Sequence, residues 1–551
     1  MQFEVVLNNE KQTFDKKVKL LSLTNGDTNI ICASVNGRIR ELDYDLYYDS
    51  TVHFLTVKDH EAMGIYERGI RFIFAMAAHL CYPKLRFKLT YSISRSIFAQ
   101  IIDGNIKMVT LEMTNNIEKK MKEIVQENFL FERIIVTNEK AEEIYKEYNL
   151  FDKAEIVQYR PEKTVHLYTA NGYFNYMYGK MVPSAGYLKD FKLKQYSNGL
   201  IIQYPRSEFE GKIPPFSDEP VFRDTLIHSQ AWGNLVNLST VVGINSHIKS
   251  SEAVQLINMC EDRHNKMLSE LGEKIEDNID DIRVICIAGP SSSGKTTFAD
   301  RLTVELLSRG IKPIRISIDD YYKKREDVPK DEDGNYDFEC LNALDVDLFN
   351  DNVNDLLEGK TVDLPVFSFK ENKRKIGRTV TIGPEDPIII EGIHALNEDM
   401  TPRIPKYIKF KIYIAPQAQI NIDDENPISL TDIRLIRRMV RDNKYRGAGA
   451  EETIRMWPSV RKGEFKWIYN TQEDADYVFD SFLNYEICVL KKYALPLLQK
   501  IDRDGEYGPD AERLIKLIKY FKDIDDKWIP CNSLLKEFIG GSCYRDCLSL
   551  E

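Results

Sequence analysis

Short apolar runs alternate with helical patterns along the second half of the chain. The runs stand at Val284–Ala288, Ile314–Ile318, Ile388–Glu391 and Ile408–Ile414, and a helical sequence begins at Lys295. A run that is apolar at every position is typical of a strand covered on both faces. The alternation predicts an α/β fold with a doubly wound parallel sheet, in which ligands bind at the carboxyl ends of the strands.

The first half of the chain has a different pattern. Residues 1–55 alternate apolar and polar positions in short runs, and the following part mixes strand-like runs with helices such as Ile117–Asn128. A long polar helix is expected over His247–Leu271. The sequence therefore predicts four segments: an α+β module at 1–60, an α+β domain at 61–215, a helical connector at 216–275 and the α/β domain at 276–551.

The first apolar run leads into Gly289-Pro290-Ser291-Ser292-Ser293-Gly294-Lys295-Thr296, which fits the phosphate-loop pattern. In such a loop the backbone N–H groups cradle phosphate oxygens, the lysine reaches the terminal phosphates and the Thr hydroxyl binds Mg²⁺. A strand followed by a glycine-rich turn and a helix N-terminus is the geometry of an anion site. The pattern predicts binding of ATP through Gly289, Ser291, Ser292, Ser293, Gly294, Lys295, Thr296 and Thr297.

Two carboxylates follow other predicted strands of this sheet. Asp319 stands at the end of Ile314–Ile318, and Glu391 ends Ile388–Glu391. A carboxylate beside a phosphate loop can accept the proton of an attacking hydroxyl or hold Mg²⁺. The alternative is that both acids only cap the next turn or helix.

Four arginines at 434, 437, 438 and 441 share one face of a predicted helix. Like charges at this spacing destabilise an isolated helix, so such a face is expected to meet an anion. The alternative is a solvated face paired with Asp432 and Asp442. The glycines of Gly447-Ala448-Gly449 would supply a hinge, and the sequence predicts a helical lid that brings arginine to the transferred phosphoryl group.

Composition limits the range of functions. The formal net charge of −11 gives no general attraction to nucleic acid or to anionic membranes. Nine mostly isolated cysteines and the lack of a long apolar stretch indicate a cytoplasmic protein that does not enter a membrane. The motifs of zinc proteases, of α/β-hydrolases and of the guanine-reading site of GTPases are missing, which favours a small-molecule kinase.

Together these motifs resemble the uridine kinase/phosphoribulokinase family over roughly residues 276–551. The resemblance implies that Asp319 is the general base, that Lys295 and Arg441 act on the transferred group, and that Thr296, Glu391 and Asp319 hold Mg²⁺. It also implies that Glu339 holds ribose hydroxyls, in a position where uridine kinases carry Asp. The substrate-binding residues by this resemblance are Tyr322, Phe338, Glu339, Phe367, Phe369, Asn372, Arg438 and Arg446.

Several positions depart from the pattern of the family. Relatives that read uracil use a Tyr-Asp-Phe-x-x-His segment, which here begins with Phe367 and ends with Asn372. The lid positions aligned with Arg and Gln are Ala448 and Met456. Because hydrogen bonds to the base provide much of the selectivity of such sites, uracil specificity is not expected to carry over.

The N-terminal half resembles the front of threonyl-tRNA synthetases over about residues 1–215. Residues 1–60 are similar to the TGS module, and residues 61–215 are similar to the editing domain. The editing histidines align with Arg68 and Phe72, and the later pair of functional residues with Met177 and Met181. None of these four residues can perform the hydrolysis, so no editing activity is expected.

The sequence thus predicts an ATP- and Mg²⁺-dependent kinase that phosphorylates the 5′-hydroxyl of a ribonucleoside. One alternative acceptor is a sugar phosphate or another small alcohol. A different alternative is an NTP-binding regulator with an RNA-sensing N-terminal half, against which the acidic net charge counts. Partners beyond the nucleoside and ATP are left open, including a homo-oligomer.

Overall fold

The apolar runs of the C-terminal half, residues 276–544, form a five-stranded parallel sheet in the order β16-β19-β15-β20-β23. Ile285 and Ile287 of the central strand β15 belong to one hydrophobic core, whereas Val284 and Cys286 belong to another. Burial on both faces explains why this strand is apolar throughout, and the predicted parallel α/β sheet is confirmed. The strands are β15 (Val284–Ala288), β16 (Ile314–Ser317), β19 (Ile388–Glu391), β20 (Lys409–Ala415) and β23 (Tyr477–Asp480).

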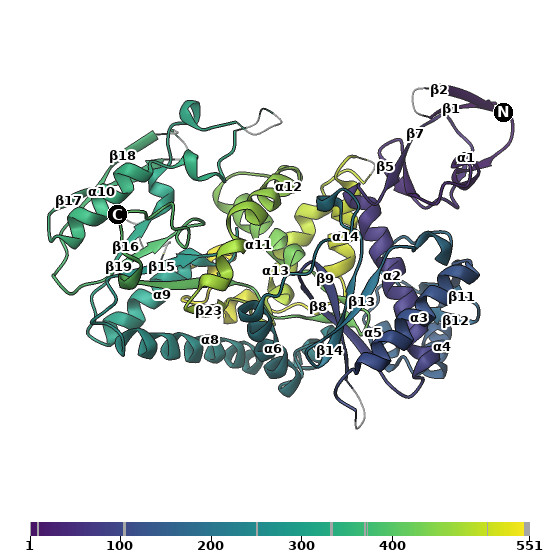
Figure 1. Ribbon diagram of the computed structural model, residues 1–551, viewed down its shortest axis with the longest axis horizontal. Coiled ribbons are helices and arrows are strands. Elements are labelled where there is room, and N and C mark those ends of the chain that lie inside the picture. The colour runs from purple at the N-terminus through teal and green to yellow at the C-terminus, as the bar shows by residue number, and fades with distance from the viewer. Residues whose placement is uncertain are drawn as a thin grey trace.

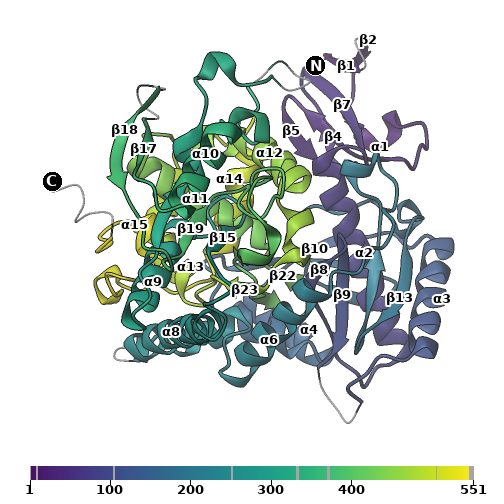
Figure 2. The same ribbon diagram turned by 60° about the vertical axis from the view of Figure 1, so that its left-hand side comes forward.

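A computed structural model describes residues 2–7, 10–102, 106–249, 252–330, 334, 336–368, 371, 373–503 and 505–544. The C-terminal half fills the left of Figure 1, with the sheet between helices, and Figure 2 shows the same packing from another side. Two small hairpins stand outside the main sheet. The helices are α9 (Lys295–Ser308), α10 (Val346–Leu357), α11 (Leu430–Tyr445), α12 (Ala450–Trp467), α13 (Glu486–Leu498), α14 (Gly508–Ile518) and α15 (Lys536–Ile539), and the hairpins are β17 (Val362–Ser368) with β18 (Lys373–Val380) and β21 (Asn421–Asp423) with β22 (Asn426–Pro427).

The N-terminal half, residues 2–215, is built from three larger sheets and several helices. Its first sheet has the order β2-β1-β7-β4-β5 and projects at the upper right of Figure 1. A three-stranded sheet, β10-β11-β12, and a four-stranded sheet, β13-β14-β9-β8, follow. The strands of the first sheet are β1 (Phe3–Leu7), β2 (Glu10–Phe14), β4 (Ile30–Val35), β5 (Arg38–Arg40) and β7 (Ser50–Thr56), beside the short helix α1 (Leu20–Leu23) and the short pair β3 (Val18–Lys19) and β6 (Asp45–Leu46). The later strands are β8 (Phe87–Ile93), β9 (Ser96–Ile101), β10 (Glu132–Thr137), β11 (Thr164–Ala170), β12 (Tyr173–Asn175), β13 (Lys192–Tyr196) and β14 (Gly199–Gln203), with helices α3 (Leu111–Glu127), α4 (Asn138–Glu147) and α5 (Phe151–Val157).

Helix α2 (His60–Cys81) is the central helix of this half, and most of its side chains are buried. It carries the charged residues Glu67, Arg68 and Arg71 near its middle. No helix in the described part of the chain combines the length and apolarity that a bilayer crossing needs.

Three helices connect the halves: α6 (Pro220–Leu235), α7 (Val241–Ser246) and α8 (Glu252–Glu276). Helix α8 runs along the lower edge of the molecule in Figure 1 and shares a hydrophobic core with α9, through Leu271 and Leu302 among others. The connector is therefore packed onto the C-terminal half. The predicted boundaries at residues 60, 215 and 275 remain predictions, because adjoining segments share cores.

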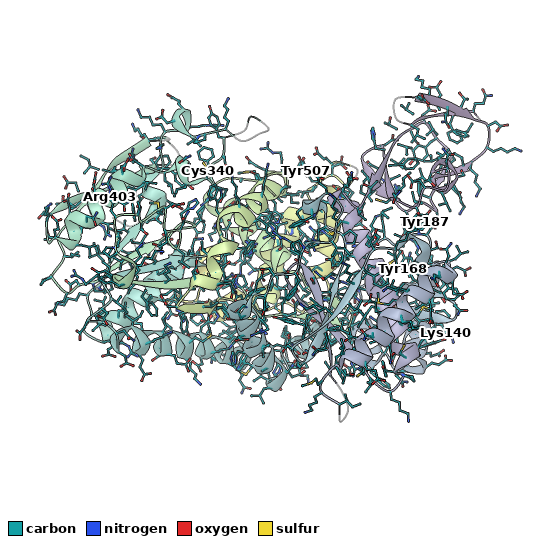
Figure 3. All side chains as sticks on the ribbon, viewed as in Figure 1. Lys140, Tyr168, Tyr187, Cys340, Arg403 and Tyr507 are labelled. Atoms are coloured by element: carbon teal, nitrogen blue, oxygen red, sulfur yellow. The ribbon has the colours of Figure 1, made fainter. Side chains whose placement is uncertain are left out.

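A glutamate of the first module ties it to the rest of the N-terminal half. Glu41 Oε1 accepts hydrogen bonds from the hydroxyl of Tyr168 at 2.6 Å and from the backbone N–H of Met181 at 2.7 Å. Tyr168 is labelled in Figure 3, well apart from Arg403 and Cys340 of the C-terminal half. A partly buried carboxylate with two such donors fixes the module against the following domain.

The β21–β22 hairpin of the C-terminal half docks into the N-terminal half. Asn421 Nδ2 donates to the carbonyl of Leu89 at 2.7 Å, and the backbone N–H of Asp424 donates to Asp152 Oδ2 at 2.7 Å. Arg86 Nη2 pairs with Asp424 Oδ2 at 2.6 Å. These contacts make the junction between the halves a specific interface.

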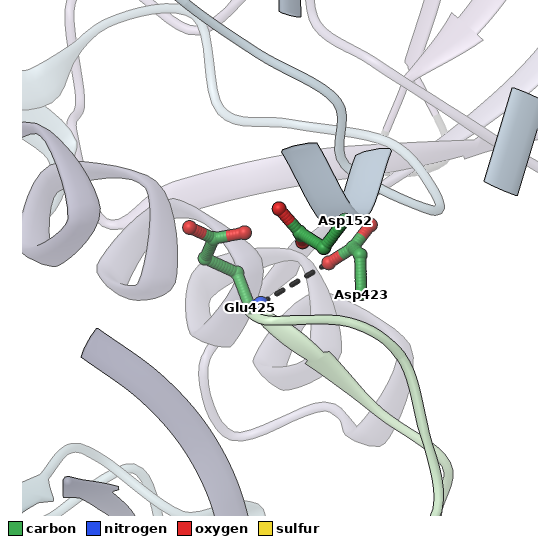
Figure 4. Close-up of side chains that lie close together, drawn as sticks. All are labelled: Asp152, Asp423 and Glu425. Atoms are coloured by element: carbon green, nitrogen blue, oxygen red, sulfur yellow. Dashed lines mark hydrogen bonds between the residues drawn. The ribbon is translucent and has the colours of Figure 1, made fainter. Parts of the chain in front are cut away.

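One buried lysine lies at the centre of that interface. Lys153 Nζ is 2.8 Å from Asp423 Oδ1 and 2.6 Å from Glu425 Oε2, and its side chain is 1% exposed. Figure 4 shows these two carboxylates beside Asp152, with the hydrogen bond from the Glu425 N–H to Asp423. The three acids lie close enough to hold a metal ion, but the ammonium group of Lys153 already supplies the positive charge.

Candidate active site

The phosphate-loop sequence forms the turn between β15 and α9, at the centre of the sheet edge. Gly289 is required there because an added Cβ would lie 2.0 Å from the carbonyl oxygen of Ile414. Gly294 has φ +93°, in the left-handed region that favours glycine. Both ends of the loop therefore depend on glycine for close backbone packing.

The loop retains unused capacity to bind an anion. The hydroxyls of Ser292 and Ser293 are buried and have no hydrogen-bond partner among the described residues. The first N–H groups of a helix have no partner within it, so the N-terminus of α9 adds further donors. These groups fit the phosphates of a nucleoside triphosphate.

Lys295 points toward the start of its own loop. Its Nζ donates to the carbonyl oxygens of Gly289 at 2.9 Å and Pro290 at 3.1 Å. Burial lowers the pKa of Lys295, while the charges of Glu391 and Asp319 oppose this shift. The lysine is thus held at the loop beside two carboxylates.

The predicted carboxylates occupy adjacent strand ends. Glu391 ends β19 in register with Ser317 of β16, and Ser317 Oγ donates to Glu391 Oε1 at 2.9 Å. Asp319 follows in the short helix η3 (Ile318–Tyr321). Burial, together with the neighbouring charge of Asp319, raises the pKa of Glu391 to about 7. Burial also raises the pKa of Asp319, while Lys295, Arg446 and Arg441 oppose that shift.

These acids can perform two kinds of chemistry. A carboxylate whose pKa is raised toward neutrality is a more effective proton acceptor near pH 7. A pair of carboxylates near Lys295, the residue before the half-buried Thr296, also provides the oxygen ligands that Mg²⁺ prefers. The structure thus brings Asp319, Glu391 and Lys295 together.

The arginines of α11 do not share one role, and the prediction that all four face an anion is wrong for two of them. Arg434 pairs with Glu464, with Nη2 2.8 Å from Oε2. Arg437 is completely buried and pairs with Glu486 through Nε–Oε1 at 2.8 Å. These carboxylates come from α12 and α13, far along the chain, so no local pattern indicates the pairing.

Of the other two arginines, Arg438 contacts the loop, and the charge of Arg441 acts on Lys295. Arg438 Nη1 donates to Ser291 Oγ at 2.9 Å, and Arg441 Nε donates to Asp442 Oδ1 at 2.8 Å. Asp442 also pairs with the more exposed Arg446. Asp442 is thus the shared partner of Arg438, Arg441 and Arg446, whereas Asp432 pairs with Arg513. Closure of α11 and α12 as a lid remains a prediction.

The residues predicted to bind the substrate form an aromatic and acidic side of the site. The ring of Tyr322 lies 6.2 Å from that of Phe338 and 5.9 Å from that of Phe367. Burial raises the pKa of the neighbouring Glu339 to about 7, although the charge of Arg438 opposes the shift. Two other predicted substrate residues, Phe369 and Asn372, lie outside the described residues.

The structure adds a residue that the sequence analysis missed. His394 is buried, and its Nε2 lies 2.9 Å from the carbonyl oxygen of Glu339. Burial lowers the pKa of His394, so its ring is neutral at physiological pH and donates to this carbonyl. Its position three residues after Glu391, at the end of a predicted strand, could have marked His394 as a candidate site residue.

A parallel sheet that presents a phosphate loop, a lysine and strand-end carboxylates at one edge defines a phosphotransferase of the P-loop class. Residues 284–488 match the family model described as the Phosphoribulokinase / Uridine kinase family. A uridine kinase of Borrelia turicatae is 35% identical over 205 residues, which are 36% of this chain and 85% of the relative. The chain therefore belongs to the Phosphoribulokinase / Uridine kinase family.

Two further similar proteins are a curated relative and a solved structure. A uridine kinase of Bacillus pumilus is 32% identical over 198 residues, covering 35% of this chain and 84% of the relative. The solved structure of a possible uridine kinase from Bacillus stearothermophilus is 21% identical and covers 38% of this chain and 100% of that chain, with a TM-score of 0.26. Residues before 284 and after 488 lie outside the family match.

Proposed function

We propose that the chain transfers the γ-phosphoryl group of ATP to the 5′-hydroxyl of a ribonucleoside. The observation that carries the proposal is the meeting of Lys295, Asp319 and Glu391 at the phosphate loop, with Glu339 on the acceptor side. The charges of Lys295 and Asp319 act on both Glu391 and Glu339, which links the loop to the side of the site that carries Glu339. Phosphoryl transfer depends mainly on such positioning and charge stabilisation.

Each residue has a part in this proposal. The loop holds the phosphates, and Lys295 neutralises the charge that develops on the transferred group. Asp319 accepts the proton of the attacking hydroxyl, and Thr296, Glu391 and Asp319 would hold Mg²⁺. When bound, Mg²⁺ would neutralise phosphate charge. Arg438, which contacts the loop, and Arg441, whose charge acts on Lys295, would contact phosphate oxygens.

The acceptor pocket supports a ribonucleoside more strongly than it supports one particular base. Glu339 provides a carboxylate for ribose hydroxyls, and Tyr322 and Phe338 provide flat surfaces for a base. Phe367 has no hydroxyl with which to read the base edge. This loss favours broad base specificity, and it also keeps a sugar phosphate or another small alcohol as the alternative acceptor.

The affinity for the nucleoside should depend on pH through Glu339. Because burial raises the pKa of Glu339 to about 7, this side chain gains a proton as the pH falls through that value. The protonated carboxyl accepts fewer hydrogen bonds from ribose hydroxyls. The KM for the nucleoside should therefore rise as the pH falls below about 7, by at most about tenfold per pH unit. Steady-state kinetics between about pH 5.5 and pH 8.5 would measure this dependence. The pH profile of KM should follow the titration of about one group.

A matched variant separates Glu339 from other titrating groups. Glu339→Gln keeps the shape of the side chain but cannot titrate in this range, so its KM should be higher and flat with pH. A variant that retained the pH dependence of the wild type would show that another group causes it.

The acceptor is tested by ATP consumption with uridine, cytidine, adenosine, guanosine and inosine, and with ribulose 5-phosphate as the alternative. The proposal expects a nucleoside 5′-monophosphate as the product, identified by mass and by its phosphorus resonance. Turnover of ribulose 5-phosphate alone would establish the alternative and overturn the nucleoside assignment.

For the N-terminal half we propose a non-catalytic role, whether or not its resemblance to synthetase domains reflects ancestry. Phe72, Met177 and Met181 are all buried in its hydrophobic core, and Arg68 Nε donates to the carbonyl of Lys180 at 2.9 Å. These contacts support the expectation that no hydrolytic site operates there. RNA that copurifies with the protein at moderate salt would instead favour the RNA-sensing alternative.

A further inference from the structure

A segment beyond the family match packs directly on the phosphate loop. Residues 533–541 include α15, and Leu534, Leu535 and Phe538 are at most 1% exposed. Leu534 covers the second glycine of the loop, because a Cβ added to Gly294 would lie 2.5 Å from Leu534 Cδ2. The segment therefore contacts the loop backbone itself.

An acid of this segment takes one of the donors of the loop. Glu537 Oε2 accepts the backbone N–H of Thr297 at 3.1 Å. Thr297 lies in the first turn of α9 and is 3% exposed, while Glu537 is 4% exposed. This N–H is one of the unpaired donors that a phosphate loop presents to an anion. A carboxylate of the chain thus stands in a position where phosphate oxygen is expected.

The segment also contacts helix α11. Lys444 Nζ donates to the carbonyl of Ile539 at 2.8 Å, and the guanidinium of Arg437 lies 5.1 Å from the centre of the Phe538 ring. Gly540 and Gly541 follow with φ of 88° and 78°, backbone conformations that favour glycine. Movement of the segment would therefore affect both the loop and α11.

We propose that residues 533–541 form an autoinhibitory strap, in which Glu537 competes with the phosphates of the nucleotide for the N-terminus of α9. The inference rests on the proposed function, since it takes a nucleoside triphosphate as the ligand of this loop. Two anions cannot share one buried N–H, so nucleotide binding requires Glu537 to leave Thr297. Only molecules with an open strap bind the nucleotide, so the apparent Kd equals the Kd of the open form divided by the fraction of molecules that are open.

Binding of ATP to full-length variants tests the strap. Glu537→Ala removes the competing acid, and titration calorimetry should give a Kd for Mg-ATP about tenfold lower than that of the wild type. Glu537→Gln removes only the charge and should fall between the two. Glu512→Ala, which removes an exposed acid of α14, is the matched control and should bind as the wild type does.

Unchanged or weaker ATP binding by folded Glu537→Ala and Glu537→Gln would overturn the strap. If the alanine variant does not fold, amide hydrogen exchange of wild-type residues 533–541 decides: exchange should increase when Mg-ATP is added, and unchanged or slower exchange refutes the strap. Tighter ATP binding without phosphorylation of any nucleoside would uphold the strap and overturn the proposed function. Phosphorylation of a nucleoside with equal ATP affinity in all variants would overturn the strap alone.

Discussion

Replacing Lys295 by alanine should reduce phosphoryl transfer by about 10²–10³-fold or more, the effect of removing one preorganised charge from a reacting centre. Lys295 is the lysine of the phosphate loop, and its Nζ donates to two backbone carbonyls of the same turn. Its loss removes positive charge from the loop and from the neighbouring buried carboxylates Asp319 and Glu391. The measurement is initial velocity with saturating acceptor, beside circular dichroism and thermal unfolding.

Lys312→Ala is the control for Lys295→Ala, since Lys312 is an exposed lysine near the far end of α9. It should keep wild-type velocity. Near-normal turnover by a folded Lys295→Ala protein would remove the assignment of this loop to phosphoryl transfer.

Lys153→Met should destabilise the protein by about 3–5 kcal/mol, the usual cost of removing one partner of a buried ion pair. The substitution leaves Asp423 and Glu425 without their cation, in a site where the lysine side chain is 1% exposed. Chemical denaturation, followed by fluorescence and circular dichroism, measures the loss. The two halves should also separate into distinct unfolding transitions when their interface weakens.

The matched control is Lys146→Met on helix α4, where the side chain is 58% exposed and pairs with Glu142. An exposed pair of this kind contributes about 0–1 kcal/mol, so the control should unfold almost as the wild type does. Equal stability of the two variants would show that the buried cluster adds nothing to the interface.

Local patterns allowed the sequence to predict the parts of the site that depend on short segments. The loop around Gly289 and Gly294 requires a strand, a tight turn and a helix, and all three can be recognised within about 25 residues. The strand-end acids Asp319 and Glu391 were also found, because the apolar runs before them mark where the strands end. These features come from neighbouring residues and from the geometry of parallel sheets.

Pairings between distant elements could not be predicted in the same way. Glu464 and Glu486 lie 30 and 49 residues from Arg434 and Arg437, and no periodicity links them. Glu537 lies 240 residues from Thr297, so its position on the loop became visible only in three dimensions. The charge of a side chain was readable from sequence, but whether it faces solvent, substrate or a buried partner depended on tertiary packing.

The hairpin between the halves has a consequence for how the chain reaches its native state. The hydrogen bond from the Asp424 N–H to Asp152 joins residues that are 272 positions apart. Contacts of such long range slow folding because a large loop must close before they stabilise the structure. During synthesis the docking site on the first half exists well before the hairpin leaves the ribosome. We therefore expect the first half to fold before the hairpin docks on it, so that the position of the hairpin and of the following start of α11 depends on a surface that is already formed.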